Sequence, residues 1–119
     1  MTIDQLSYCV ALPRAEVIAQ LNDRLRKTGE GGTFVITRNV TGLAGVNAQE
    51  LVTELANYDD FNDDNNPHGE RDMGRFKLFN ANLYFKIDYF DPDLNFGSSD
   101  PTDPGVTHRL LTIMTEADL

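Results

Sequence analysis

The chain has 119 residues, with 10 basic and 19 acidic side chains and a formal net charge of −9. This length predicts one domain that spans residues 1–119. The acidic balance excludes a protein that binds bare phosphate backbones through a basic surface. A single cysteine, Cys9, excludes a disulfide within the chain, and no apolar run approaches the roughly 20 residues of a membrane helix. We therefore expect a small, soluble, acidic domain.

The first residues of the chain indicate the cellular compartment in which we expect the protein. Residues 6–12 are apolar, but Asp4 precedes them and no basic segment does, so we expect no signal peptide. The lone Cys9 fits a reducing compartment and is expected to be a small buried apolar side chain. These features predict a cytoplasmic protein. The sequence contains neither a dinucleotide-binding motif nor a nucleophile motif, and we expect no cofactor.

The charge is concentrated in the second half of the chain. Residues 1–57 carry five basic and six acidic side chains, a net charge of −1, whereas residues 58–119 carry five and thirteen, a net charge of −8. Most of the acidic residues in the second half are aspartates, which favour turns over helix interiors. We therefore expect the acidic side chains on loops, where a partner can reach them.

The most regular predicted element is a helix over residues 14–27. Its apolar residues recur in steps of three and four, which places Val17 or Ile18, together with Leu21 and Leu25, on one stripe. Gly29 is expected to end it. The opposite side of this helix carries the polar residues Asn22, Asp23, Arg24 and Arg26.

A strand and a second helix are predicted next. Residues 33–40 are β-branched and aromatic, which favours a strand. Asn47, with Glu50 three positions later, is typical of a capping box at a helix start. This second helix is expected to end at Asn57.

The second half predicts strands separated by long polar loops. Residues 58–74 form the first loop, which is long for a small domain. Residues 75–90 read as a hairpin with its turn at 80–82. A second loop covers 91–105, and the loose alternation of 107–115 favours a last strand over a helix. The order predicts an α+β fold: a small, mostly antiparallel sheet of about four strands with two helices packed on one face.

The first loop contains oxygen-bearing side chains at every second position, as at the start of a calcium-binding EF-hand loop. These are Asp60, Asn62, Asp64 and Asn66. The pattern then fails, because the sixth position is Asn65 instead of glycine and the twelfth is Arg71 instead of glutamate. We favour a run of turns in which the side chains bond to their own backbone.

The same loop carries a second candidate cluster of His68, Glu70 and Asp72, which Asp88 of the neighbouring strand would complete. Imidazole and carboxylate groups ligate metals and transfer protons. The spacing matches no strong metal-binding motif. The alternative is that His68 and Glu70 hold the loop through hydrogen bonds or by pairing with arginines.

Blocks in order along residues 14–115 carry a family resemblance. They are Asn22–Arg26, Gly31–Gly32, Phe34–Thr37, Asp60–Phe61, Asn66–Glu70, Asp72, Gly74, Lys86–Asp91, Gly97–Pro101 and Leu111–Met114. In sequence and spacing they resemble a small proteobacterial domain of unknown function, family 3768. Arg71 and Met73 depart from it, because the family usually has a histidine and an aromatic residue there. The resemblance implies an accessory protein of plasmids, phages and integrated elements.

The acidic second half and this resemblance favour an interaction protein. Carboxylates on rigid loops can replace phosphates on a basic, nucleic-acid-binding surface. The expected partner is a host defence nucleoprotein or nuclease, which the chain would inhibit as an anti-CRISPR or anti-restriction factor, by DNA mimicry. We expect no direct contact with nucleic acid or membrane. The predicted partner-binding residues are Asp59, Asp60, Asp63, Asp64, Glu70, Asp93, Asp100 and Asp103.

Two alternatives remain open. The first is a small metal-dependent enzyme that uses His68, Glu70, Asp72 and Asp88, and whose melting temperature rises when a divalent metal binds. The second is a homodimeric structural protein that pairs through an exposed sheet edge.

Overall fold

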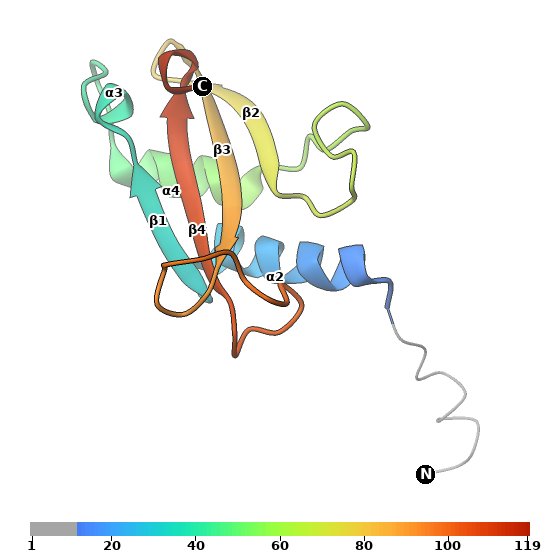
Figure 1. The fold of residues 1–119 in the computed structure, drawn as a ribbon. Coiled ribbons are helices and arrows are strands. Elements are labelled where there is room, and N and C mark those ends of the chain that lie inside the picture. Colours follow the sequence, from blue (N-terminus) through green and yellow to red (C-terminus); the bar gives the residue numbers. More distant parts are fainter. Residues whose placement is uncertain (1–11) are drawn as a thin grey trace, which may run out of the picture.

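The structure is a computed structural model that describes residues 12–119 (Figure 1). The predictions for Cys9 and for residues 6–11 of the apolar segment lie outside the described residues. No helix formed by residues 12–119 is long and apolar enough to cross a membrane.

A four-stranded sheet forms the centre of the fold. Its strands lie side by side in the order β1-β4-β3-β2. Strand β3 is antiparallel to both of its neighbours, whereas β1 runs parallel to β4. The predicted α+β class and mostly antiparallel sheet are confirmed, and the parallel edge is an addition. The strands are β1 (Gly32–Ile36), β2 (Met73–Leu78), β3 (Ala81–Phe90) and β4 (His108–Thr115).

The two predicted helices lie on the same face of the sheet, as Figure 1 shows. They are α2 (Arg14–Thr28) and α4 (Ala48–Asn57), and two shorter elements are α3 (Arg38–Thr41) and the 3-10 helix η1 (Glu116–Asp118). Leu25 of α2 and Leu55 of α4 are fully buried against the sheet. On β3, the alternate residues Leu83, Phe85 and Ile87 complete this core, as the period of two in a strand requires.

The helix ends follow the local sequence. Gly29 adopts φ 79° at the C-terminal end of α2, and its N–H donates to the carbonyl of Leu25, which is the conformation that glycine allows there. At the start of α4, the side chain of Asn47 accepts from the N–H of Glu50 at 3.1 Å. Both predicted helix boundaries are therefore confirmed to within one residue.

The predicted strand over residues 33–40 is wrong at its end. Strand β1 stops at Ile36, and α3 begins at Arg38. The reason is tertiary: Asp118, far along the chain, accepts hydrogen bonds from Thr37 Oγ1 at 2.7 Å and Asn39 Nδ2 at 2.8 Å. The helical turn also brings Val40 into the core, where it is fully buried.

The hairpin turn is tighter than predicted. Strand β2 ends at Leu78 and β3 begins at Ala81, so the turn is made by Phe79 and Asn80, both with positive φ (54° and 59°). Positive φ at both central positions is typical of the two-residue turns that match the twist of a hairpin. Asn tolerates this conformation and Phe rarely adopts it, so the sequence signal for the turn was weak. The predicted last strand is confirmed as β4.

Candidate functional site

Both polar loops attach to the same end of the sheet. The first loop, residues 58–72, leads into β2. The carbonyl of its last residue, Asp72, accepts from the N–H of Ile87 in β3 at 2.7 Å. The second loop, residues 91–107, leaves β3 where Phe90 pairs with His108 of β4. The ends of the two loops therefore meet beside α2.

Asn22 of α2 binds the first loop directly and is connected to the second loop through Arg109. Its side chain is fully buried, and Nδ2 donates to the carbonyl of Glu70 at 2.9 Å and to the hydroxyl oxygen of Tyr89 at 2.8 Å. Its Oδ1 accepts from Arg109 Nε at 2.8 Å. Arg109 in turn donates to the carbonyl of Pro101 at 2.6 Å. One buried amide thus connects the end of the first loop to the middle of the second.

Tyr89 and Arg109 extend this network. The Tyr89 hydroxyl donates to Glu70 Oε1 at 2.8 Å, and the Arg109 guanidinium lies 5.1 Å from the centre of the Tyr89 ring, a distance that allows a cation–π interaction. Burial raises the pKa of Tyr89 well above its ordinary range. Burial also lowers the pKa of Arg109. The raised pKa keeps Tyr89 protonated at neutral pH, as the donor of its hydrogen bond to Glu70.

A second group of ionic contacts holds the first loop against α2. Arg71 adopts a positive φ of 52° and donates to Asp23 from Nη2 at 2.8 Å and to Glu16 at 3.3 Å. The hydrogen bonds from Arg71 Nε and Nη2 to the Asp23 carboxylate form a two-pronged contact of the kind that gives arginine its orientational specificity. Asp23 also accepts from Arg26, which donates to the carbonyl of Leu55 in α4.

These contacts show what the sequence analysis missed. Asn22 and Arg26 were placed on the polar side of the first helix, yet both are buried, at 0% and 2% exposure. A helical pattern treats every polar residue alike, whereas burial of these two depends on partners on other elements, such as the carbonyls of Glu70 and Leu55. The one sequence signal for them is that both lie in the Asn22–Arg26 block that resembles the family.

The tip of the first loop is a run of turns closed by asparagine side chains. Asn62 Oδ1 accepts from the N–H groups of Asp64 at 2.9 Å and Asn65 at 3.2 Å. Asn65 Nδ2 donates to the carbonyl of Asp60 at 2.8 Å, and Asn66 Oδ1 accepts from the N–H of Arg71. The predicted local bonding is confirmed, and it occupies two of the four oxygen-bearing side chains of the EF-hand-like pattern.

The second loop is closed by its own side chains. Asp100 Oδ1 accepts from the hydroxyl of Thr102 at 2.7 Å and from Arg14 of α2 at 3.0 Å. These hydrogen bonds, that of Thr102 first, lower the pKa of Asp100. The carbonyl of Asp100 accepts from the hydroxyl of Thr107, which also bonds to Ser98 at 2.7 Å. Arg14 and Arg109 together tie this loop to the scaffold.

The predicted partner-binding residues fall into two groups. Glu70 and Asp100 are partly buried and are engaged by Tyr89 and Thr102, so their carboxylates help to hold the loops. Of the two ways in which Glu70 was expected to hold the loop, the structure shows the hydrogen bond, which comes from Tyr89 rather than from an arginine. The other six are exposed and form no ion pair within residues 12–119. We call them the loop aspartates: Asp59, Asp60, Asp63, Asp64, Asp93 and Asp103.

The predicted metal cluster does not assemble in the described part of the chain. Within residues 12–119, no three His, Cys, Asp or Glu side chains lie close enough together to hold a metal ion. Asp88 pairs with Lys86 at 3.4 Å, and His68 is exposed. Asp72 is partly buried, and this burial raises its pKa, with Glu70 adding to the effect.

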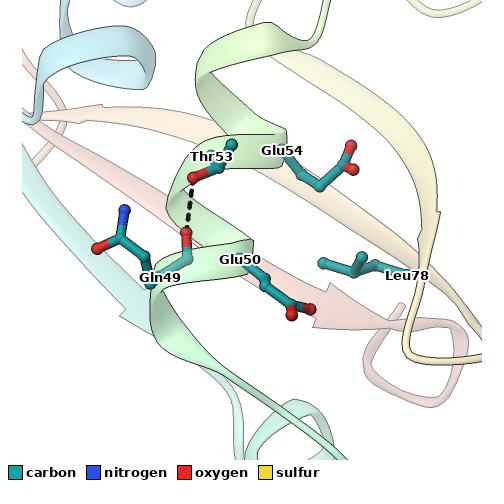
Figure 2. Close-up of a pocket in the computed structure, with 5 residues that line it drawn as sticks. All are labelled: Gln49, Glu50, Thr53, Glu54 and Leu78. Atoms are coloured by element: carbon teal, nitrogen blue, oxygen red, sulfur yellow. Dashed lines mark hydrogen bonds between the residues drawn. The ribbon is translucent and has the colours of Figure 1, made fainter.

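Two grooves on the surface differ in whether loop aspartates line them. A groove of about 500 Å³ lies between the first loop and β2, with Asp60 and Asp64 among its lining residues. A shallower groove of about 200 Å³ lies between α4 and Leu78. Figure 2 shows Glu50 and Glu54 of α4 on the side of the helix that faces Leu78. These two glutamates are exposed carboxylates on a regular helix and belong to neither loop.

Comparison with known proteins identifies the family to which the chain belongs. No curated protein and no solved structure matches the chain. A sequence profile with the description "Protein of unknown function (DUF3768)" matches residues 36–118, which is more than half of the chain. The chain therefore belongs to the DUF3768 family.

Proposed function

We propose that this protein is a small interaction protein whose loop aspartates bind a basic, nucleic-acid-binding surface of another protein. The observation that carries the proposal is that these six exposed carboxylates stand on two loops whose backbones are tied to α2 and to β4 by partly buried hydrogen bonds. Loops held in this way present negative charge at defined positions. A partner therefore loses little binding free energy to loop ordering.

The electrostatics favour a cationic partner. Carboxylates that are not neutralised by neighbouring cations attract a basic surface over a distance of about 10 Å at moderate salt. Such attraction mainly accelerates association and selects the partner.

The family resemblance suggests which partner this is. An accessory protein of a mobile element benefits from blocking a host defence nuclease or nucleoprotein, and such proteins bind DNA or RNA through basic surfaces. We propose that the chain acts in the cytoplasm as an anti-CRISPR or anti-restriction factor and occupies that surface as a DNA mimic.

The test compares two variants of equal charge. Asp63→Asn with Asp64→Asn removes two carboxylates from the first loop, and Glu50→Gln with Glu54→Gln removes two from α4. The immobilised parent chain is exposed to host lysate at low salt, and the proteins eluted by a salt gradient are identified by mass spectrometry. Binding of the purified partner is then measured for the parent and both variants.

We expect the loop variant to weaken binding by about tenfold or more and the α4 variant by less than about twofold. Affinity should fall steeply between about 50 and about 500 mM salt, and double-stranded DNA should compete for the partner. Equal losses in the two variants, or binding that does not depend on salt, would contradict the proposal. If the partner binds the chain but double-stranded DNA does not compete for it, only the DNA-mimicry part of the proposal is rejected.

A further inference from the structure

One edge of the sheet has unused hydrogen-bonding groups. Strand β1 is outermost in the sheet, next to β4. The N–H of Thr37 donates to the carbonyl of Ile113 at 3.1 Å, and backbone groups alternate in direction along a strand. The N–H and C=O groups of the even-numbered residues Gly32, Phe34 and Ile36 therefore point away from β4. No described residue forms a hydrogen bond with them.

This edge lacks the features that usually prevent pairing. Edge strands are normally protected by charged residues, proline, bulges or a covering segment. Strand β1 has the sequence Gly-Thr-Phe-Val-Ile, without charge or proline. In Figure 1 it lies at one side of the sheet, and no described segment runs along its outer edge. At the opposite edge, β2 carries Arg75 and Lys77, and the Tyr58 hydroxyl accepts from the N–H of Arg75 at 3.3 Å.

The residues at the two ends of β1 have opposite charges. Glu30 lies two positions before the strand and Arg38 lies two positions after it. Both are exposed. If a second copy pairs antiparallel with its Phe34 opposite the first Phe34, Glu30 of each copy lies at the same end as Arg38 of the other. Two copies related by a two-fold axis therefore place Glu30 of one near Arg38 of the other at both ends of the paired strands, as a symmetric dimer requires.

We infer that the protein forms a homodimer in which β1 pairs antiparallel with β1 of a second copy, centred on Phe34. This register pairs Gly32 with Ile36 and Phe34 with Phe34, and the outward groups form about six hydrogen bonds. Phe34 and Ile36 face the helix side and are only partly buried in one chain, so pairing covers their remaining surface. The first loop, which joins the sheet at β2, stays free on both outer sides.

The first test measures mass against concentration for the full chain. Sedimentation should show one chain at about 1 µM and two chains as the concentration rises toward about 500 µM, because dimers form by mass action. Val35→Lys places two like charges near the centre of the paired strands and should raise the dissociation constant by about tenfold or more. Val52→Lys on α4 is the matched control, since Val35 and Val52 are 38% and 41% exposed.

The second test uses charge reversal. All variants in this test carry Arg24→Gln, which removes the partner of Glu30 within its own chain. In this background Glu30→Arg alone and Arg38→Glu alone should each weaken the dimer, and the two together should restore it, because the swap recreates opposite charges across the antiparallel pair. This rescue identifies the orientation and does not depend on the folding of the Val35 variant. Circular dichroism of each variant as a monomer controls for folding.

Hydrogen exchange locates the contact. The amide of Val35 points toward β4 and should be protected at every concentration, whereas those of Phe34 and Ile36 should become protected only as the dimer forms. A single-chain mass up to about 500 µM would overturn the inference. So would a dimer that is unaffected by Val35→Lys, or one in which Phe34 and Ile36 stay unprotected. These outcomes do not depend on whether the loop aspartates bind a basic partner.

Discussion

Asn22 and Arg109 are 87 positions apart in the chain and are joined by a 2.8 Å hydrogen bond in the interior of the protein. Arg109 is 2% exposed and Asn22 is fully buried. The contact connects α2 to β4. Arg109 also donates a hydrogen bond to the carbonyl of Pro101, which connects β4 to the second loop. Because Asn22 also donates to the carbonyl of Glu70, this one amide contributes to the placement of both acidic loops.

Removing the amide should therefore destabilise the whole fold. Asn22→Ala removes three hydrogen bonds, those to the Glu70 carbonyl, the Tyr89 hydroxyl oxygen and Arg109 Nε. We expect the free energy of unfolding to fall by about 2–4 kcal/mol, measured by urea denaturation. Gln20→Ala, an exposed change on the same helix, should alter it by less than about 0.5 kcal/mol. A similar small loss for Asn22→Ala would contradict the central role of the network.

Gly74 is predicted to tolerate no side chain. A Cβ atom there would lie 2.5 Å from the ring of Tyr58 and 2.6 Å from that of Phe85. Those rings pack edge to face with their centres 5.2 Å apart, so they cannot move aside freely. Gly74→Ala should lower the free energy of unfolding by about 1–3 kcal/mol. Gly97→Ala is the control, because its nearest atom is 3.9 Å away, and it should be close to neutral.

Asp72 should make the protein less stable as pH rises. Burial raises its pKa above the ordinary 3.8, so the folded state holds this proton in a pH range where the unfolded chain has lost it. Stability is therefore lost as pH rises from 3.8 through the raised pKa. Asp72→Asn should remove this loss, which urea denaturation of both proteins across that range will show. Carbon NMR titration of the Asp72 carboxyl at or below 3.8 would contradict the prediction.

Asp118 should have the opposite dependence. Hydrogen bonds from the N–H of Thr115 and the hydroxyl of Thr37, that of Thr115 first, lower its pKa below 3.8. The stabilisation it provides is therefore present above 3.8 and is lost as pH falls through the lowered pKa. Asp118→Asn should reduce the melting temperature at neutral pH, with a smaller difference from the parent in acid. The same change at the exposed Asp93 should leave the melting temperature unchanged.

Much of the fold was predictable because its signals are local. Gly29 ends α2 and Asn47 begins α4 through contacts within three or four residues of each, and the alternation in β3 follows from the period of a strand. The end of β1 was not predictable, because α3 depends on Asp118. Nor was the two-residue turn at Phe79, since the register that buries the core side of β3 imposes it.

The candidate site divides in the same way. The sequence alone determined that the negative charge lies on two loops, because aspartate in runs with asparagine, proline and glycine favours turns, and it also carried the family resemblance. Only the tertiary structure decided which carboxylates are free to bind a partner. Glu70 and Asp100 are engaged by Tyr89 and Thr102. A buried hydrogen bond joins residues far apart in the chain, and no local pattern records which distant partner will satisfy a polar side chain.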